Sequence, residues 1–348
     1  MFHEIILENK VKKEDYYFKS KIYKRKGKKP SDFINDYKYN KYIKSEDIKQ
    51  IQKISGIFNT PEDIDEYVKN LLPGSFGIWC KFELESPYFS NDDDNLYIIQ
   101  NPIIKETISK IPMVKGSSWK GLLSSVALNK LRENVESKDI PSIISCYLSF
   151  VRIFGTGSET FRKLEREIKK VIGEAERKNS TKLTEILFQY CVFDLGININ
   201  IKKDGTSINK QLIDEIIKKQ NEQKVKNIFS VNKGRAIFYP TYFNKINYEV
   251  INPHDREKRV GINPIFYEVV PKGAIGIFQL IYIPHNGILL EENVLKSEME
   301  SDKEFIEKIL KEALENVGIG AKTKLGWGRG KIKENDIKYF ESNVGGVK

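Results

Sequence analysis

The residues best suited to chemistry lie together near the C-terminus, in the stretch GIGAKTKLGWGRG from Gly318 to Gly330. Its glycines let the backbone approach a phosphate closely and adopt positive φ angles. Lys322, Lys324 and Arg329 can neutralise phosphate charge, and Trp327 offers a ring face to a nucleobase. The pattern favours contact with a nucleic-acid backbone. Its structural alternative is a tight turn in a basic protein.

The spacing of this stretch excludes a nucleotide-binding P-loop. A P-loop needs Gly directly before its Lys, a strand before the loop and a helix after it. Here Ala321 precedes Lys322, and a helical apolar pattern at 302–317 comes before the stretch. The residues expected to contact RNA are Gly318, Gly320, Lys322, Thr323, Lys324, Gly326, Trp327 and Arg329.

A second candidate phosphate site is the turn IPMVKGSSWKG (111–121), which precedes a helical apolar pattern. Ser117 or Ser118 can cap that helix. The N–H groups at a helix start, together with the helix dipole, also favour a phosphate. Capping and phosphate contact use the same geometry, so both interpretations stay open. The second set of candidate RNA-binding residues is therefore Lys115, Gly116, Ser117, Ser118 and Lys120.

Acidic and histidine residues provide only weak candidates for catalysis. Asp92, Asp93 and Asp94 could hold Mg²⁺, but a solvated acidic turn is the favoured interpretation of NDDDN. His254 could act as a general base, yet no second His or Cys stands near it, and an Asn-Pro turn explains its surroundings. We expect no catalytic residue, no bound metal and no cofactor.

Composition limits the class of protein. The 348 residues carry a formal net charge of +10, which favours an anionic partner, nucleic acid first; a Lys-rich proteome is the alternative. The three cysteines are too far apart for a zinc site or a disulfide framework. No apolar run approaches the roughly 18 residues of a membrane span. We expect a soluble, cytoplasmic protein without a membrane partner.

The elements that would position these residues indicate an α+β fold. Residues 76–87 alternate as a half-buried strand, and two apolar runs flank a Pro271-Lys272-Gly273 turn as expected for a hairpin. We expect tandem ferredoxin-like (RRM-like) folds with RNA on a sheet or in a groove between them. The predicted divisions are an N-terminal extension (1–75), a first half (76–160), a helical insertion (161–230) and a second half (231–348).

The predicted extension is polar and rich in Lys and Tyr, with helical spacing only at 61–72, where Thr60 is the expected cap. Tyrosine is favoured at interfaces. We expect the extension to order against a neighbouring subunit or RNA and to contribute little to the main fold. A flexible solubilising arm is the alternative.

Several stretches together resemble the RAMP superfamily of CRISPR-associated proteins. They are Gly318–Gly330, which resembles the family's C-terminal glycine-rich loop, IPMVKGSSWKGLLSSVAL (111–128), RIFG (152–155) and GRAIFYPTYF (234–243). The stretch 249–280 is similar to the Asn-Pro-His segment and hairpin of the terminal RAMP subunit of type III effectors. These stretches follow the family's order.

The resemblance implies a non-catalytic subunit of a crRNA-guided type III effector in antiviral defence. Its partners would be crRNA, target RNA and other Cas subunits, and it would hold RNA backbone while base pairing reads sequence. Two alternatives stay open. One is a RAMP endoribonuclease that processes the guide or cuts target RNA. The other is a standalone RNA-binding protein, although the chain lacks an aromatic RNP stretch.

Overall fold

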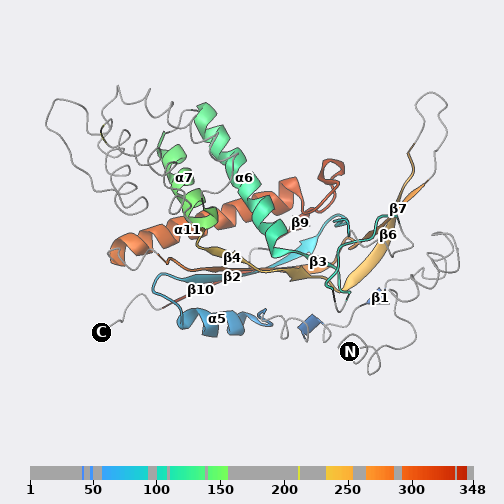
Figure 1. The fold of residues 1–348 in the computed structure, drawn as a ribbon, viewed down its shortest axis with the longest axis horizontal. Helices are drawn as coiled ribbons and strands as arrows, with labels where there is room; N and C mark the ends of the chain where they lie inside the picture. Colours follow the sequence, from blue (N-terminus) through green and yellow to red (C-terminus); the bar gives the residue numbers. More distant parts are fainter. Residues whose placement is uncertain are drawn as a thin grey trace, which may run out of the picture.

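The computed structural model shows a mixed α+β fold built on antiparallel sheets (Figure 1). It describes residues 41–42, 48–49, 57–92, 100–107, 110–137, 140–155, 211, 233–253, 264–285, 292–333 and 335–342. The helical insertion predicted at 161–230 lies outside these residues, apart from Gln211.

One antiparallel sheet forms the centre of the fold. Its strands are β2 (Phe76–Leu84), β4 (Ala236–Phe238), β8 (Ile275–Tyr282), β9 (Gly330–Lys331) and β10 (Ile337–Glu341). They lie in the order β10-β2-β8-β4, with β9 against the end of β2. The alternation predicted a strand from residue 76, and β2 confirms it. Its first five residues are nevertheless buried on both faces, because helices cover both sides there.

Three helices cover one face of this sheet and a fourth covers part of the other (Figure 1). On the first face lie α6 (Gly116–Ser137), α7 (Ile140–Phe154) and α11 (Glu292–Glu312), which continues as a π turn (Ala313–Val317). The main core fills the space between them and the sheet. Its largest members are aromatic, and Trp119 meets Phe82 and Phe278 edge-on.

The strand order makes this sheet a single βαββαβ unit. Taken along the chain, β2, β4, β8 and β10 occupy the positions of a split βαβ motif, with α6 and α7 in the first crossover and α11 in the second. Strands from both predicted halves therefore share one sheet. The described part of the chain thus contains one ferredoxin-like unit, and the division into two halves stays a prediction. Strand periodicity identifies a strand but not its partner, so it did not indicate this shared sheet.

The fourth helix, α5 (Pro61–Lys69), confirms the predicted cap. The Thr60 side chain accepts from the Asp63 N–H while the Asp63 carboxylate accepts from the Thr60 N–H. Ile64 and Val68 are fully buried against the sheet, each contributing about 1.5–3 kcal/mol of hydrophobic stabilisation. This part of the predicted extension therefore belongs to the core, and α5 covers part of the sheet face on which RNA was expected.

Two smaller sheets stand beside the main one. They contain β1 (Lys41–Tyr42), β6 (Lys245–Ile251) and β7 (Ile265–Val269) in one, and β3 (Met113–Val114) and β5 (Thr241–Tyr242) in the other. The predicted hairpin around Pro271–Gly273 is wrong as a pairing. The turn exists, with Gly273 at φ 77°, but β7 pairs with β6 while β8 pairs with β2 and β4. The two strands that flank the turn therefore belong to different sheets.

The end of α7 and the residues before β4 lie side by side, and we call this junction (152–155 with 233–235) the neck. Arg235 N–H donates to the Arg152 carbonyl at 2.7 Å, and Gly155 and Lys233 form an antiparallel bridge. A Cβ on Gly234 would lie 2.4 Å from the Ile153 carbonyl oxygen, so this close approach requires glycine. Gly155 and Lys233, the described residues on either side of 156–232, are thus neighbours.

Replacing residues 156–232 with a Gly-Ser linker of about four residues is expected to leave the main sheet folded, because the neck already holds the two ends together. Thermal unfolding followed by circular dichroism measures this. The matched control carries the same linker plus Gly234→Val, which should unfold at a clearly lower temperature. A linker variant without a cooperative transition would contradict the expectation.

Candidate nucleic-acid interface

The glycine-rich loop (Gly318–Gly330) follows the π turn at the end of α11. Four of its glycines have positive φ, and so does Lys322 at φ 64°. Space explains Gly320: a Cβ there would lie 2.3 Å from the Phe89 carbonyl oxygen and 2.7 Å from the Tyr88 ring. At Gly326, by contrast, a Cβ would meet nothing within 4 Å. Gly320 is therefore required by a close contact as well as by its positive φ, whereas Gly326 is required by its positive φ alone.

Backbone hydrogen bonds hold the root of the glycine-rich loop on both sides. Ala321 N–H donates to the Phe89 carbonyl at 2.7 Å, and Gly328 N–H donates to the Pro87 carbonyl at 2.8 Å. Across the loop, Ile319 N–H donates to the Gly328 carbonyl at 2.9 Å. The segment that follows β2 is thus the platform on which the loop is built.

The tip of the loop is a short 3₁₀ turn (Thr323–Leu325) that uses its own amides. Leu325 N–H donates to the Lys322 carbonyl, and Gly326 N–H donates to the Thr323 carbonyl. These amides are not free to cradle a phosphate. The available positive charge comes from side chains, because Lys322, Lys324 and Arg329 are all exposed. This geometry suits contact with phosphates by lysine and arginine.

Trp327 packs inside an aromatic cluster. Its ring meets Phe89 at 6.4 Å and Tyr267 at 5.6 Å, both nearly perpendicular, and it is half-buried. Lys322 Nζ lies 5.4 Å from the Tyr267 ring centroid, a cation–π contact. Trp327 therefore supports the loop, and its stacking on a nucleobase stays a prediction.

The second predicted site is Lys115–Lys120, which we call the α6 turn. Helix α6 begins there at Gly116, earlier than expected. The Lys115 carbonyl accepts from Ser118 N–H at 2.9 Å, so Ser117 and Ser118 lie in the first helical turn instead of capping it. A Cβ on Gly116 would lie 2.2 Å from the Phe238 carbonyl oxygen, so glycine lets the helix start against β4. Lys115, Ser117, Ser118 and Lys120 are exposed.

Tyr88 connects the two predicted sites. Its side chain is 1% exposed, and its hydroxyl donates to the Met113 carbonyl at 3.0 Å, just before the α6 turn. The same ring lies against Gly320 of the glycine-rich loop. Burial raises the pKa of the Tyr88 hydroxyl far above its ordinary value, which keeps it a neutral donor. Sequence reasoning did not single out Tyr88, because nothing in SPYF marks it.

The acidic candidates are only partly described. Asp92 N–H donates to the Pro102 carbonyl at 2.9 Å, which places Asp92 in a paired segment. Asp93, Asp94 and His254 lie outside the described residues. Within the residues that the structure does describe, there is no group of three or more His, Cys, Asp or Glu side chains that could hold a metal ion.

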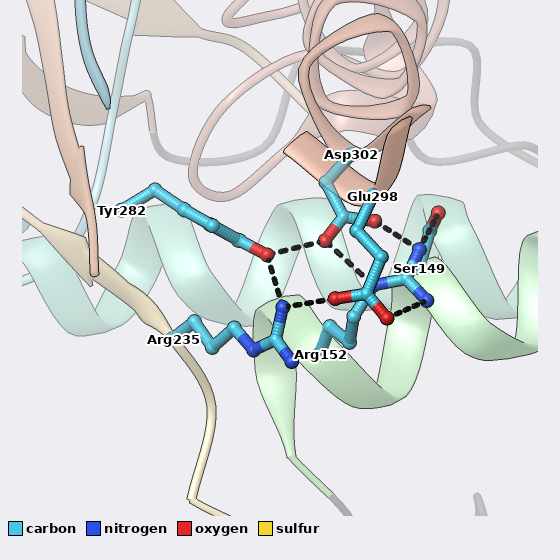
Figure 2. A network of polar contacts seen from close by, with 6 residues as sticks. All are labelled: Ser149, Arg152, Arg235, Tyr282, Glu298 and Asp302. Carbon is cyan, nitrogen blue, oxygen red and sulfur yellow. Dashed lines mark hydrogen bonds and ion pairs between the residues drawn. The ribbon is translucent and has the colours of Figure 1, made fainter. Parts of the chain in front are cut away.

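A buried network of charges joins α7, β8 and α11 beside the neck (Figure 2). Arg152 holds both oxygens of the Asp302 carboxylate, with Nε–Oδ2 at 2.8 Å and Nη2–Oδ1 at 2.7 Å. The Tyr282 hydroxyl donates to Asp302 Oδ2 at 2.6 Å. Arg235 Nη1 donates both to the Tyr282 hydroxyl and to Glu298, each at 2.8 Å.

The charges in this network stabilise one another. Burial alone would lower the pKa of Arg152, but the Asp302 carboxylate outweighs it and raises that pKa above its ordinary value. Burial, followed by the charge of Asp302, raises the pKa of Tyr282. The resemblance marked RIFG and GRAIF as motifs without indicating that Arg152 and Arg235 meet. The network serves the fold, and its two arginines leave no charge open for RNA.

The model of the RAMP superfamily matches residues 81–331. A solved type III-B Cmr-beta complex bound to cognate target RNA contains a similar chain, at 12% identity and a TM-score of 0.41, covering 97% of this chain and 81% of that one. Cmr6 from Pyrococcus furiosus matches at 16% identity and a TM-score of 0.30, covering 74% and 99%. Curated proteins gave no significant match.

Among the described residues, no helix is both long and apolar enough to cross a lipid bilayer.

Proposed function

Since the chain belongs to the RAMP superfamily, we propose that it is an RNA-binding subunit of a type III CRISPR effector complex in antiviral defence. In this role it holds the backbone of crRNA and target RNA and contacts other Cas subunits in the cytoplasm. We place it at the end of the RAMP filament, because the stretch 249–280 resembles the terminal subunit of such effectors.

One observation carries this proposal. Two exposed basic segments, the glycine-rich loop and the α6 turn, are attached to the same buried residue, Tyr88. Hydrogen bonds hold the backbone that carries these cations, so less conformational entropy is lost when RNA binds. The overall charge of +10 adds long-range attraction for the same partner.

Removing three cations from the glycine-rich loop is expected to weaken RNA binding and flatten its salt dependence. The variant carries Lys322→Ala, Lys324→Ala and Arg329→Ala. Each lost phosphate contact on a single strand reduces the slope of log affinity against log salt by about 0.7, so the three together reduce it by about 2. Fluorescence anisotropy with labelled single-stranded RNA at several salt concentrations measures both effects.

The matched control removes the same charge elsewhere. Lys69, Lys296 and Lys308 are exposed on α5 and α11, and their replacement by alanine should leave the slope close to wild type. Equal loss in both triple variants would mean that only net charge matters, which contradicts an interface at the loop. Cleavage of the RNA in the presence of Mg²⁺ would favour the endoribonuclease alternative.

A further inference from the structure

We infer that Tyr88 is the positioning residue that sets the spacing between two phosphate contacts on one RNA strand. The inference rests on the proposed function, since it assumes that both basic segments bind RNA. It goes further by joining them into one continuous track. It also assigns a role to a buried tyrosine that contacts no ligand itself.

The geometry gives Tyr88 two partners. Its hydroxyl donates to the Met113 carbonyl at 3.0 Å, and its ring lies so close to Gly320 that a Cβ there would be 2.7 Å away. Lys115 comes two positions after Met113, and Lys322 comes two positions after Gly320, each a step of at most about 7 Å. The backbones of Lys115 and Lys322 are therefore both held at a short distance from the Tyr88 side chain.

Neighbouring contacts make this junction stiff. Tyr88 N–H donates to the Val270 carbonyl at 2.9 Å, and Val270 N–H donates back to the Tyr88 carbonyl at 3.0 Å. The next residue, Phe89, accepts from Ala321 of the loop. Two links join this backbone to the residues before the α6 turn. One is the Tyr88 hydroxyl bond to the Met113 carbonyl, and the other runs through Ile104, whose N–H donates to the Ser90 carbonyl and whose carbonyl accepts from Met113 N–H. In Figure 1 the glycine-rich loop, in dark red, rises on the same side of the sheet as α6.

A single strand long enough to touch both segments gains from this spacing, and a shorter one does not. When two contacts are held at a set distance, the second binds almost as an intramolecular event. If the spacing varies, that advantage falls while each contact alone is unchanged. The length of the RNA therefore separates a positioning role from a general effect on folding.

The experiment uses Tyr88→Phe, which keeps the ring and removes only the hydroxyl. We measure its affinity for an RNA of about ten nucleotides and for one below about four, the range of strand lengths that one binding domain covers. We expect about a three- to ten-fold loss for the long RNA, the size of one hydrogen bond, and no change for the short one. Tyr67→Phe, an exposed tyrosine on α5, is the matched control and should bind both RNAs like wild type.

Different results point to different failures. If Lys115→Ala or Lys322→Ala leaves binding of the long RNA unchanged, that segment is not a contact and the proposed interface fails. If both lysines matter but Tyr88→Phe binds both RNAs like wild type, or loses equally with both, the positioning role is overturned.

A measurement on the wild-type protein tests the inference even if one of the variants folds poorly. Lysine acetylation followed by mass spectrometry should show Lys115 and Lys322 protected together by the long RNA and not by the short one. Protection of only one lysine by the long RNA would also overturn the inference.

Discussion

Replacing Arg152 with alanine is expected to lower the free energy of unfolding by about 3–5 kcal/mol, because it leaves a buried carboxylate without its cation. Asp302 is fully buried and receives two hydrogen bonds from the Arg152 guanidinium. The remaining donor described on it, the Tyr282 hydroxyl, carries no charge to compensate. Urea unfolding followed by tryptophan fluorescence measures the loss.

A paired substitution separates the ion pair from the space that it fills. Arg152→Met combined with Asp302→Leu removes both charges and keeps most of the volume, so it should cost clearly less than Arg152→Ala alone. Lys69→Ala is the exposed control: it breaks the surface pair with Asp65, worth about 0.3–0.5 kcal/mol. A loss below about 1 kcal/mol for Arg152→Ala would show that the network does not stabilise the fold.

The second large effect is expected at Gly320. Alanine at this position meets two costs. The positive φ of 85° strains a residue with a Cβ by about 1–2 kcal/mol, and the Cβ would lie 2.3 Å from the Phe89 carbonyl oxygen. The backbone must move, which breaks the bond from Ala321 N–H to that carbonyl. We expect a total loss of about 2–5 kcal/mol in unfolding free energy, together with at least ten-fold weaker RNA binding.

Gly326 provides the matched control for this prediction. Its φ of 81° is nearly the same, but a Cβ there meets nothing within 4 Å. Gly326→Ala should therefore show the strain alone, and the difference between the two variants measures the close approach to Phe89. Equal losses in stability and RNA binding would mean that the loop is not built on the segment after β2. Circular dichroism of both variants establishes that the rest of the chain is folded.

Local features of the fold were predictable from the sequence. The alternation in FGIWCKFEL identified β2, and the pattern around Thr60 identified the start of α5, because both signals lie within a few consecutive residues. Pairing between distant segments was not predictable. The partner of β7 is β6 and not β8, since a strand's own pattern does not say which edge it joins.

The residues of the candidate site were likewise predictable only where the signal is local in the sequence. Lys322, Lys324 and Lys115 were identified by type and spacing, and the structure exposes all three. Tyr88 and the Arg152–Asp302 pair were missed, because their roles come from residues that are far away in sequence, at separations of 25 and 150 positions. Trp327 was interpreted as an open ring, and only its three-dimensional neighbours show it packed against Phe89 and Tyr267.

The position of α5 has a consequence for what this protein can read. RRM domains recognise sequence by stacking unpaired bases on aromatic rings at the centre of their sheet. Here Trp79, on the central strand β2, packs with Ile64 and Val68 of α5. The part of the same face that β2 and β8 leave exposed carries Lys81, Glu83 and Ile275, none of which is aromatic. In the function that we propose, these described residues offer no aromatic ring for base stacking, so discrimination among RNAs falls to a complementary nucleic acid.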